Sequence, residues 1–216
     1  IIGSFTTING ITVKGVARWD GTTWHALGTG VDISAGSTNP MCMATIGTNV
    51  YIGGAFSSVS GVPANMVAKW NGVSWSAIGS GLTGSGIPQC MISKGNNLYV
   101  GGYFTSSGAT TLNNIAKWNG TTWSALGAGF DGTVTDIKFN GNDLYASGGF
   151  TQSGSTPMNN VARWNGTAWI SVGDPLNISV YAMTFSPNVS MVGGISSSLT
   201  NLSFNNVALL KVTIGK

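Results

Sequence analysis

The chain has 216 residues, of which only 7% are charged, and its formal net charge is +3 at pH 7. Soluble domains carry about 25% charged residues, and the nine basic residues here are scattered, which excludes a phosphate-tracking surface for nucleic acid. The 33 glycines and the lack of glutamate disfavour helices, and no apolar run reaches the roughly 18–20 residues of a membrane span.

The first predicted elements are three short strands, at residues 1–5, 16–19 and 24–27. Trp19 ends the second strand and Trp24 begins the third, with a short polar turn between the two tryptophans. The chain opens without methionine and shows no signal peptide. We therefore expect a mature or trimmed segment, for which export is not excluded.

This tryptophan element recurs at intervals of roughly 46 to 51 residues and uses all eight tryptophans of the chain. A fifth copy, at residues 206–210, keeps the pattern without its tryptophan. We therefore predict one domain over residues 1–216, built from five repeats. The four pairs are Trp19/Trp24, Trp70/Trp75, Trp118/Trp123 and Trp164/Trp169. The approximate repeat boundaries are 1–40, 41–86, 87–133, 134–179 and 180–216.

One full repeat contains four predicted strands, at residues 90–94, 98–104, 114–118 and 123–126. An Asn-Gly dipeptide separates the last two strands. It is a strong hairpin signal, because both central residues of a tight hairpin turn need positive φ. A Ser/Thr/Gly-rich loop is expected between the second and third strands. Four short antiparallel strands repeated in series predict the blades of a β-propeller.

The sequence allows two interpretations of how the ring of blades closes. Only four innermost strands are clear, starting near residues 41, 90, 135 and 181. Residues 212–215 resemble the innermost strand at 44–47, so they complete the first blade or, alternatively, form an outer strand of a chain that continues. Because open sheet edges invite aggregation, we predict an all-β, five-bladed β-propeller of four-stranded antiparallel blades, with the first and last blade shared between the chain ends.

The repeats resemble kelch-type propeller repeats in their glycine pairs at 53–54, 101–102 and 193–194, each followed by a tryptophan or its position. They are more similar to repeats of the Rax2-like cell-surface polarity markers of fungi and of bacterial surface proteins. Those repeats share the pattern YVGGxF…N-x-[IV]-A-[RK]-W-[ND]-G-x-x-W, which matches residues 51–75, 99–123 and 145–169. The resemblance implies a β-propeller at a cell surface. The charged signatures of many kelch repeats are absent, so actin and ubiquitin-ligase roles are not implied.

Loop lengths separate two faces of the predicted propeller. The strand 1–2 and 3–4 turns are tight, whereas the 2–3 and 4–1 connections are long and rich in Ser and Thr. Binding residues concentrate on long loops held by a rigid scaffold, so we expect a protein or glycan partner at this long-loop face or the central channel. The long connections are residues 6–15, 28–40, 57–65, 79–89, 105–113 and 196–205.

Three aspartates fall in the 4–1 connections: Asp32, Asp131 and Asp174. They are the candidate ligand-binding residues, and backbone carbonyls beside them are suited to Ca²⁺. The commoner role of loop aspartates is to form turns, so no metal or cofactor is predicted. Asp136 belongs to an innermost strand and is expected near the channel.

For other residues that recur with the repeat, the sequence allows both a structural and a functional interpretation. The tryptophan pairs either pack successive blades together or stack on sugar rings, and packing is favoured because their positions are so regular. Cys42 and Cys90 hold equivalent positions and are expected in the core, with a bridge between repeats as the alternative. His25, the only histidine, is interpreted as a surface residue, since one histidine cannot form a zinc site alone.

Five Asn-x-Ser/Thr triplets are potential glycan acceptors in a secreted protein, although such triplets also arise by chance in a chain rich in these residues. They begin at Asn119, Asn165, Asn177, Asn188 and Asn201.

No catalytic constellation is evident: no Gly-x-Ser-x-Gly stands with histidine and acid partners. The prediction is therefore a non-catalytic extracellular or particle-surface propeller that acts as a structural or adhesive module, alone or within a larger chain or assembly. The alternative is a multivalent lectin with one sugar site per blade. A propeller hydrolase or lyase is a third hypothesis, because one fold supports many activities.

Overall fold

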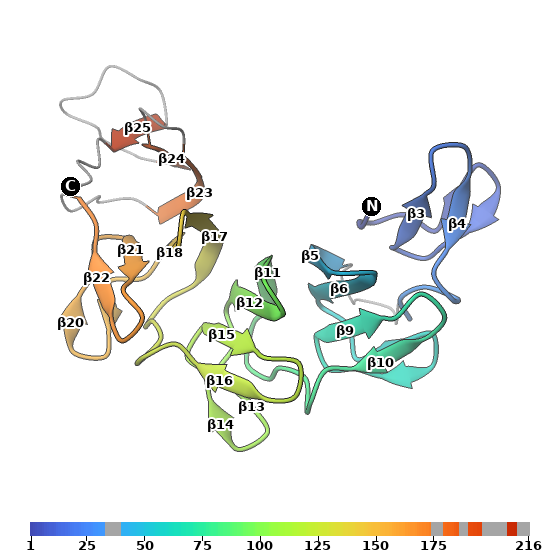
Figure 1. Ribbon diagram of the computed structural model, residues 1–216, viewed down its shortest axis with the longest axis horizontal. Coiled ribbons are helices and arrows are strands. Elements are labelled where there is room, and N and C mark those ends of the chain that lie inside the picture. The colour runs from blue at the N-terminus through green and yellow to red at the C-terminus, as the bar shows by residue number, and fades with distance from the viewer. Residues whose placement is uncertain (33–39, 174–178, 186–189, 196–206, 211–216) are drawn as a thin grey trace.

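The computed structural model describes residues 1–32, 40–173, 179–185, 190–195 and 207–210. In this part of the chain every helix or strand element is a β-strand, which confirms the all-β prediction. Figure 1 shows the sheets following one another along an open arc, with β3 and β4 on one side of the opening and β23 to β25 on the other. Within the described ranges, no helix has the length and apolar character needed to cross a membrane.

The second, third and fourth repeats each form a four-stranded antiparallel sheet, in which the second strand pairs with the third across a short separate hairpin. This confirms the predicted four-stranded unit and is propeller-like. The second sheet contains β5 (Pro40–Ile46), β6 (Asn49–Gly54), β9 (Val67–Trp70) and β10 (Trp75–Ala77). The third contains β11 (Pro88–Lys94), β12 (Asn97–Gly102), β15 (Ile115–Trp118) and β16 (Trp123–Ala125). The fourth contains β17 (Val134–Asn140), β18 (Asp143–Gly148), β21 (Val161–Trp164) and β22 (Trp169–Ser171).

Within the described residues, the blade sheets of the first and last repeats have fewer strands. β3 (Ala17–Trp19) pairs with β4 (Trp24–Ala26), and an isolated bridge joins Ile2 to Val16. β23 (Ser179–Phe185), β24 (Ser190–Ile195) and β25 (Val207–Leu210) form a three-stranded sheet. Residues 212–215, predicted to complete the first blade, lie outside the described residues.

The connections between second and third strands are wrongly predicted as plain loops, because four of them fold into two-stranded hairpins. In two of these hairpins both turn residues have positive φ, at Asn9-Gly10 (47° and 78°) and Ser60-Gly61 (52° and 76°). This is the backbone of a two-residue hairpin turn. The hairpins are β1 (Thr7–Ile8) with β2 (Ile11–Thr12), β7 (Ser58–Val59) with β8 (Val62–Pro63), β13 (Ser106–Ser107) with β14 (Thr110–Thr111), and β19 (Gln152–Ser153) with β20 (Thr156–Pro157).

The hairpin between paired tryptophans exists as predicted, but its turn differs. Trp118 pairs directly with Trp123, so the loop has four residues, and only Gly120 among them has positive φ (102°). Asn119 acts through its side chain, because its Oδ1 accepts the backbone N–H groups of Thr121 and Thr122 at 2.9 and 2.8 Å. Asparagine is therefore selected here as an Asx-turn residue rather than for positive φ.

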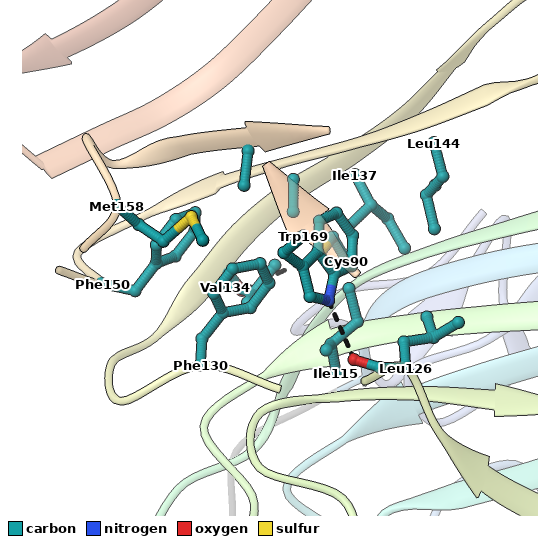
Figure 2. Close-up of a cluster of buried hydrophobic side chains, with 12 residues drawn as sticks. Cys90, Ile115, Leu126, Phe130, Val134, Ile137, Leu144, Phe150, Met158 and Trp169 are labelled. Carbon is teal, nitrogen blue, oxygen red and sulfur yellow. Dashed lines mark hydrogen bonds between the residues drawn. The ribbon is translucent and has the colours of Figure 1, made fainter. Parts of the chain in front are cut away.

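In the second, third and fourth pairs, the second tryptophan joins its repeat to the preceding one. Trp123 is buried, and its Nε1 donates a hydrogen bond of 3.0 Å to the Ile78 carbonyl of the previous repeat. Trp75 and Trp169 do the same toward Leu27 and Leu126, at 2.8 and 2.9 Å. Figure 2 shows the Trp169 bond, with the ring inside the apolar cluster between the third and fourth sheets. These three tryptophans therefore pack successive repeats together, as the favoured interpretation of the tryptophan pairs predicted.

Cys42 and Cys90 are free and buried, as expected for core residues, and they form no bridge. The Cys42 thiol points at the Gly53 carbonyl, with a distance of 3.7 Å between Sγ and O. Burial raises the pKa of Cys42 to about 12. The glycine pairs explain how these thiols fit, since an added Cβ would lie 2.8 Å from Cys42 Sγ at Gly53 and 2.7 Å from Cys90 Sγ at Gly101.

In the first four repeats, one residue just before the third strand adopts a left-handed backbone, and the second repeat places methionine there. The φ values are 80° at Gly15, 65° at Met66, 70° at Asn114 and 64° at Asn160. A non-glycine residue in this region costs about 1–2 kcal/mol, and asparagine tolerates it best. Met66→Asn is therefore expected to raise the melting temperature by roughly 2–4 °C, net of lost side-chain packing. Differential scanning calorimetry measures this change.

The reverse substitution at the equivalent position, Asn160→Met, provides the matched control and is expected to lower the melting temperature. If Met66→Asn is itself destabilising, the contacts of the Met66 side chain with the neighbouring apolar cluster outweigh the backbone strain.

Candidate ligand-binding site

At three interfaces, the long-loop face is built from contacts between a 4–1 connection and the small hairpin of the following repeat. Asp32 Oδ2 accepts the Gly61 N–H at 2.7 Å. Thr83, its counterpart one repeat later, donates its backbone N–H to the Ser106 carbonyl at 2.9 Å. The long connections are thus held in place, and they supply a rigid surface rather than loose loops.

Asp131 accepts the largest number of side-chain hydrogen bonds among these contacts. Its Oδ1 accepts the N–H groups of Thr151 and Gln152, both at 2.8 Å, and its Oδ2 accepts the Thr151 hydroxyl at 2.7 Å. Desolvation acts to raise the pKa of Asp131, but these three hydrogen bonds outweigh it and lower the pKa. The side chain is therefore a carboxylate at neutral pH, and it positions the β19–β20 hairpin.

The candidate aspartates are not brought together. Asp32 lies between the first and second repeats and Asp131 between the third and fourth, while Asp174 lies outside the described residues. Across the ranges that the structure describes, no group of three or more His, Cys, Asp or Glu side chains could hold a metal ion. Asp136 accepts the Met183 N–H at 2.7 Å and pairs with Lys138 at 3.2 Å, so it ties the fourth repeat to the fifth.

A pocket of about 360 Å³ opens on the long-loop face, where the third repeat meets the connection and hairpin of the fourth. Its walls come from the 4–1 connections, the end of β12, the start of β15 and the turn of the β19–β20 hairpin. Its volume is near the lower end of the roughly 300–1,000 Å³ found for small-molecule sites. It is lined by Ser85, Tyr103, Phe104, Thr105, Asn113, Asn114, Ala128, Phe130, Asp131 and Gly154.

Tyr103 is the exposed aromatic residue of this pocket, with 42% of its surface accessible. Its backbone N–H donates to the Ile87 carbonyl at 3.0 Å. A Cβ added at Gly86 would lie 2.7 Å from Tyr103 Cβ and 2.8 Å from Cδ1, so glycine at position 86 lets the ring lie against the connection. Sequence reasoning missed Tyr103. The available signal was the break in periodicity, since the equivalent positions are Ala55 and Gly149.

Two asparagines directly before β15 hold the wall of the pocket that faces the connection to the fourth repeat. Asn113 Nδ2 donates to the Ala128 carbonyl at 2.9 Å. Asn114 is buried, accepts the Phe104 N–H at 3.0 Å and donates to the Phe130 carbonyl at 2.9 Å. Both have positive φ. These bonds join the end of β12, the start of β15 and the connection to the fourth repeat into one frame.

The remaining predicted residues lie away from the pocket. His25 Nε2 lies 2.5 Å from Asp20 Oδ2 on the tight hairpin of the first repeat. Backbone N–H groups of Thr23 and Thr22, followed by His25, lower the pKa of Asp20. Asn119 and Asn165 are exposed on the equivalent hairpins. The other glycan-acceptor candidates, Asn177, Asn188 and Asn201, lie outside the described residues.

Comparison with known proteins indicates the fold. No protein-family model matches the chain, and no curated protein sequence matches it. The computationally designed Ika4 protein is similar over 80% of this chain and 91% of its own, with 13% identity and a TM-score of 0.49. The designed Ika8 protein is similar over 83% of this chain and 48% of its own, with 14% identity and a TM-score of 0.52.

A third solved structure is the extracellular domain of a protein assigned as a one-component system of B. thetaiotaomicron. It is similar over 85% of this chain and 23% of its own, with 13% identity and a TM-score of 0.54. This chain thus spans less than half of the Ika8 chain and less than a quarter of the bacterial one. At such identities the similarity concerns the fold alone, and activity has to be argued from the site.

Proposed function

We propose that this chain is a non-catalytic extracellular or particle-surface module that binds its partner at the long-loop face. The observation that carries the proposal is the pocket between the third and fourth repeats, whose walls are fixed by bonds from Asn113, Asn114 and Asp131. Preformed concave sites with a few placed polar groups are typical of ligand binding. The kelch-like and Rax2-like resemblance, and the extracellular setting of one structurally similar domain, support a surface location.

The proposal includes a five-bladed ring in which residues 212–215 complete the first blade. Its support is the incomplete blade sheet of the first repeat, in which β3 pairs with β4 and a single bridge joins Ile2 to Val16, and the resemblance of 212–215 to an innermost strand. Small-angle X-ray scattering distinguishes a closed ring from the open arc of Figure 1. A scattering curve that fits the open arc better would contradict closure.

An adhesion assay tests binding at the long-loop face. Beads coated with the chain are applied to immobilised mucin-type glycoprotein, to the same glycoprotein after chemical deglycosylation, and to collagen. We expect adhesion to at least one surface. Ser155→Lys, in the exposed turn of the β19–β20 hairpin, should abolish it, because a charge and a long side chain are added beside the pocket.

Val73→Lys is the matched control, since Val73 is exposed in a tight turn of the opposite face, and it should adhere like the wild type. Two results contradict the proposal: adhesion to none of the three surfaces, or adhesion that depends on Val73 and not on Ser155.

A further inference from the structure

The pocket on the long-loop face combines one exposed aromatic face with unused polar groups. The hydroxyl of Tyr103, the Oδ1 of Asn113 and the hydroxyl of Ser85 have no hydrogen-bond partner among the described residues. Asp131 Oδ2 accepts a single bond, from Thr151, and a carboxylate oxygen has capacity for another. These groups are available to a ligand without breaking the bonds that hold the walls.

The aromatic face is preorganised. Tyr103 is tethered through its backbone to Ile87, and its side chain lies against the Gly86 backbone. A tyrosine ring has few rotatable bonds and offers a flat apolar face together with a polar edge. A ligand that stacks on it therefore loses little binding energy to ordering of the site.

The lining chemistry selects among ligand classes. No lysine, arginine or histidine lines the pocket, and the Asp131 carboxylate repels anions, which disfavours phosphate and carboxylate ligands. One carboxylate is too few for Ca²⁺, which takes 6–8 oxygen ligands. A ring with apolar C–H faces and a rim of hydroxyl groups matches both the phenol face and the hydrogen-bonding groups.

We infer that this pocket is a binding site for a neutral saccharide of one or two sugar rings, in which Tyr103 stacks on a ring and Asp131 and Asn113 accept hydrogen bonds from sugar hydroxyl groups. The inference rests on the proposed function and names the ligand class of the same site. This single site differs from the multivalent lectin of the sequence analysis, which would have one equivalent sugar site in every blade. The tyrosine is replaced by Ala55 and Gly149 in the neighbouring repeats, so the chain holds one such site in its described part.

Saturation-transfer-difference NMR tests the site with glucose, galactose, mannose, N-acetylglucosamine and their common disaccharides as probes. We expect saturation transfer to at least one of them. Tyr103→Ala introduces the residue that the second repeat uses at this position, so the fold is preserved, and the affinity should fall about tenfold with loss of aromatic stacking. Asp131→Asn keeps an acceptor oxygen for the hairpin but removes the charge, and should also weaken binding.

Two matched controls accompany these variants. Tyr181→Ala removes a tyrosine that is 53% exposed on β23. Asp32→Asn changes the equivalent aspartate at the interface between the first and second repeats, two interfaces away from the pocket, so neither variant should alter the affinity. Thermal unfolding establishes that each variant is folded. Binding that survives Tyr103→Ala unchanged, or transfer to none of the probes, overturns the saccharide assignment.

Failure of this assignment is distinguishable from failure of the proposed function. Adhesion to the deglycosylated surface that is lost in Ser155→Lys, without binding of free sugars, rejects the saccharide and keeps the module. Titration with inorganic phosphate completes the test, because phosphate binding that is lost in Tyr103→Ala would identify an anion site and reject the inference.

Discussion

Replacing Trp123 with alanine is expected to lower the free energy of unfolding by about 3–5 kcal/mol, the range for large aromatic residues removed from a core. Trp123 is buried between the second and third repeats and its Nε1 donates to the Ile78 carbonyl. Its ring also lies against Gly79, where an added Cβ would be 3.1 Å from Trp123 Cδ1. The substitution leaves a cavity and a buried carbonyl without its partner. Urea denaturation followed by circular dichroism measures the change.

Trp19→Ala is the control within the same repeated element. Trp19 is 49% exposed at the edge of the first repeat, so its replacement is expected to cost about 1 kcal/mol or less. Equal losses for Trp19 and Trp123 would show that the tryptophans stabilise their own hairpins and not the contact between repeats.

Gly101→Ala is expected to lower the free energy of unfolding by about 2–3 kcal/mol, as for an overpacked core. Gly101 lies in β12, where an added Cβ would be 2.6 Å from Val134 Cγ1 and 2.7 Å from Cys90 Sγ. Both neighbours are buried, and Val134 belongs to the next repeat, so the collision separates the third and fourth sheets. The same denaturation experiment measures the effect.

Gly193→Ala changes the equivalent glycine in the fifth repeat, where nothing among the described residues lies within 4 Å of an added Cβ. It should cost much less. The double variant Gly101→Ala/Val134→Ala should lose less stability than the sum of the two single variants, because the smaller side chain makes room for the methyl group. Full additivity would mean that the methyl group at position 101 does not meet Val134.

Much of the fold could be predicted from sequence because the four strands of each sheet pair in the order in which they occur along the chain. Trp118 pairs with Trp123 and Leu98 with Trp118, so the order of strands follows from local hairpins. The backbone conformation of the hairpin turns could not be predicted in the same way. Asn119 acts through its side-chain oxygen, while the two-residue turns with positive φ lie in connections such as Asn9-Gly10. The same Asn-Gly dipeptide therefore occurs in two types of turn, and only the register of the flanking strands shows which type forms.

The candidate site could be predicted only in part. Loop lengths predict its location on the long-loop face, and the sequence marks Asp131 as a candidate. The sequence does not mark Tyr103, because a single tyrosine beside a glycine pair has no local pattern that indicates exposure. Its role depends on Gly86, on Asn113 and on a hairpin of the next repeat, which are distant in sequence or belong to different elements.

The sequence alone thus determined the repeat, the all-β class, the four-stranded unit and the division into a tight-turn and a long-loop face. These properties depend on composition, periodicity and turns within each unit. The tertiary structure decided which tryptophans join the repeats, what Asp32 and Asp131 bind, and where a pocket forms. Those properties depend on how successive sheets meet, and an interface between sheets is set by shape and backbone carbonyls that the order of residues does not display.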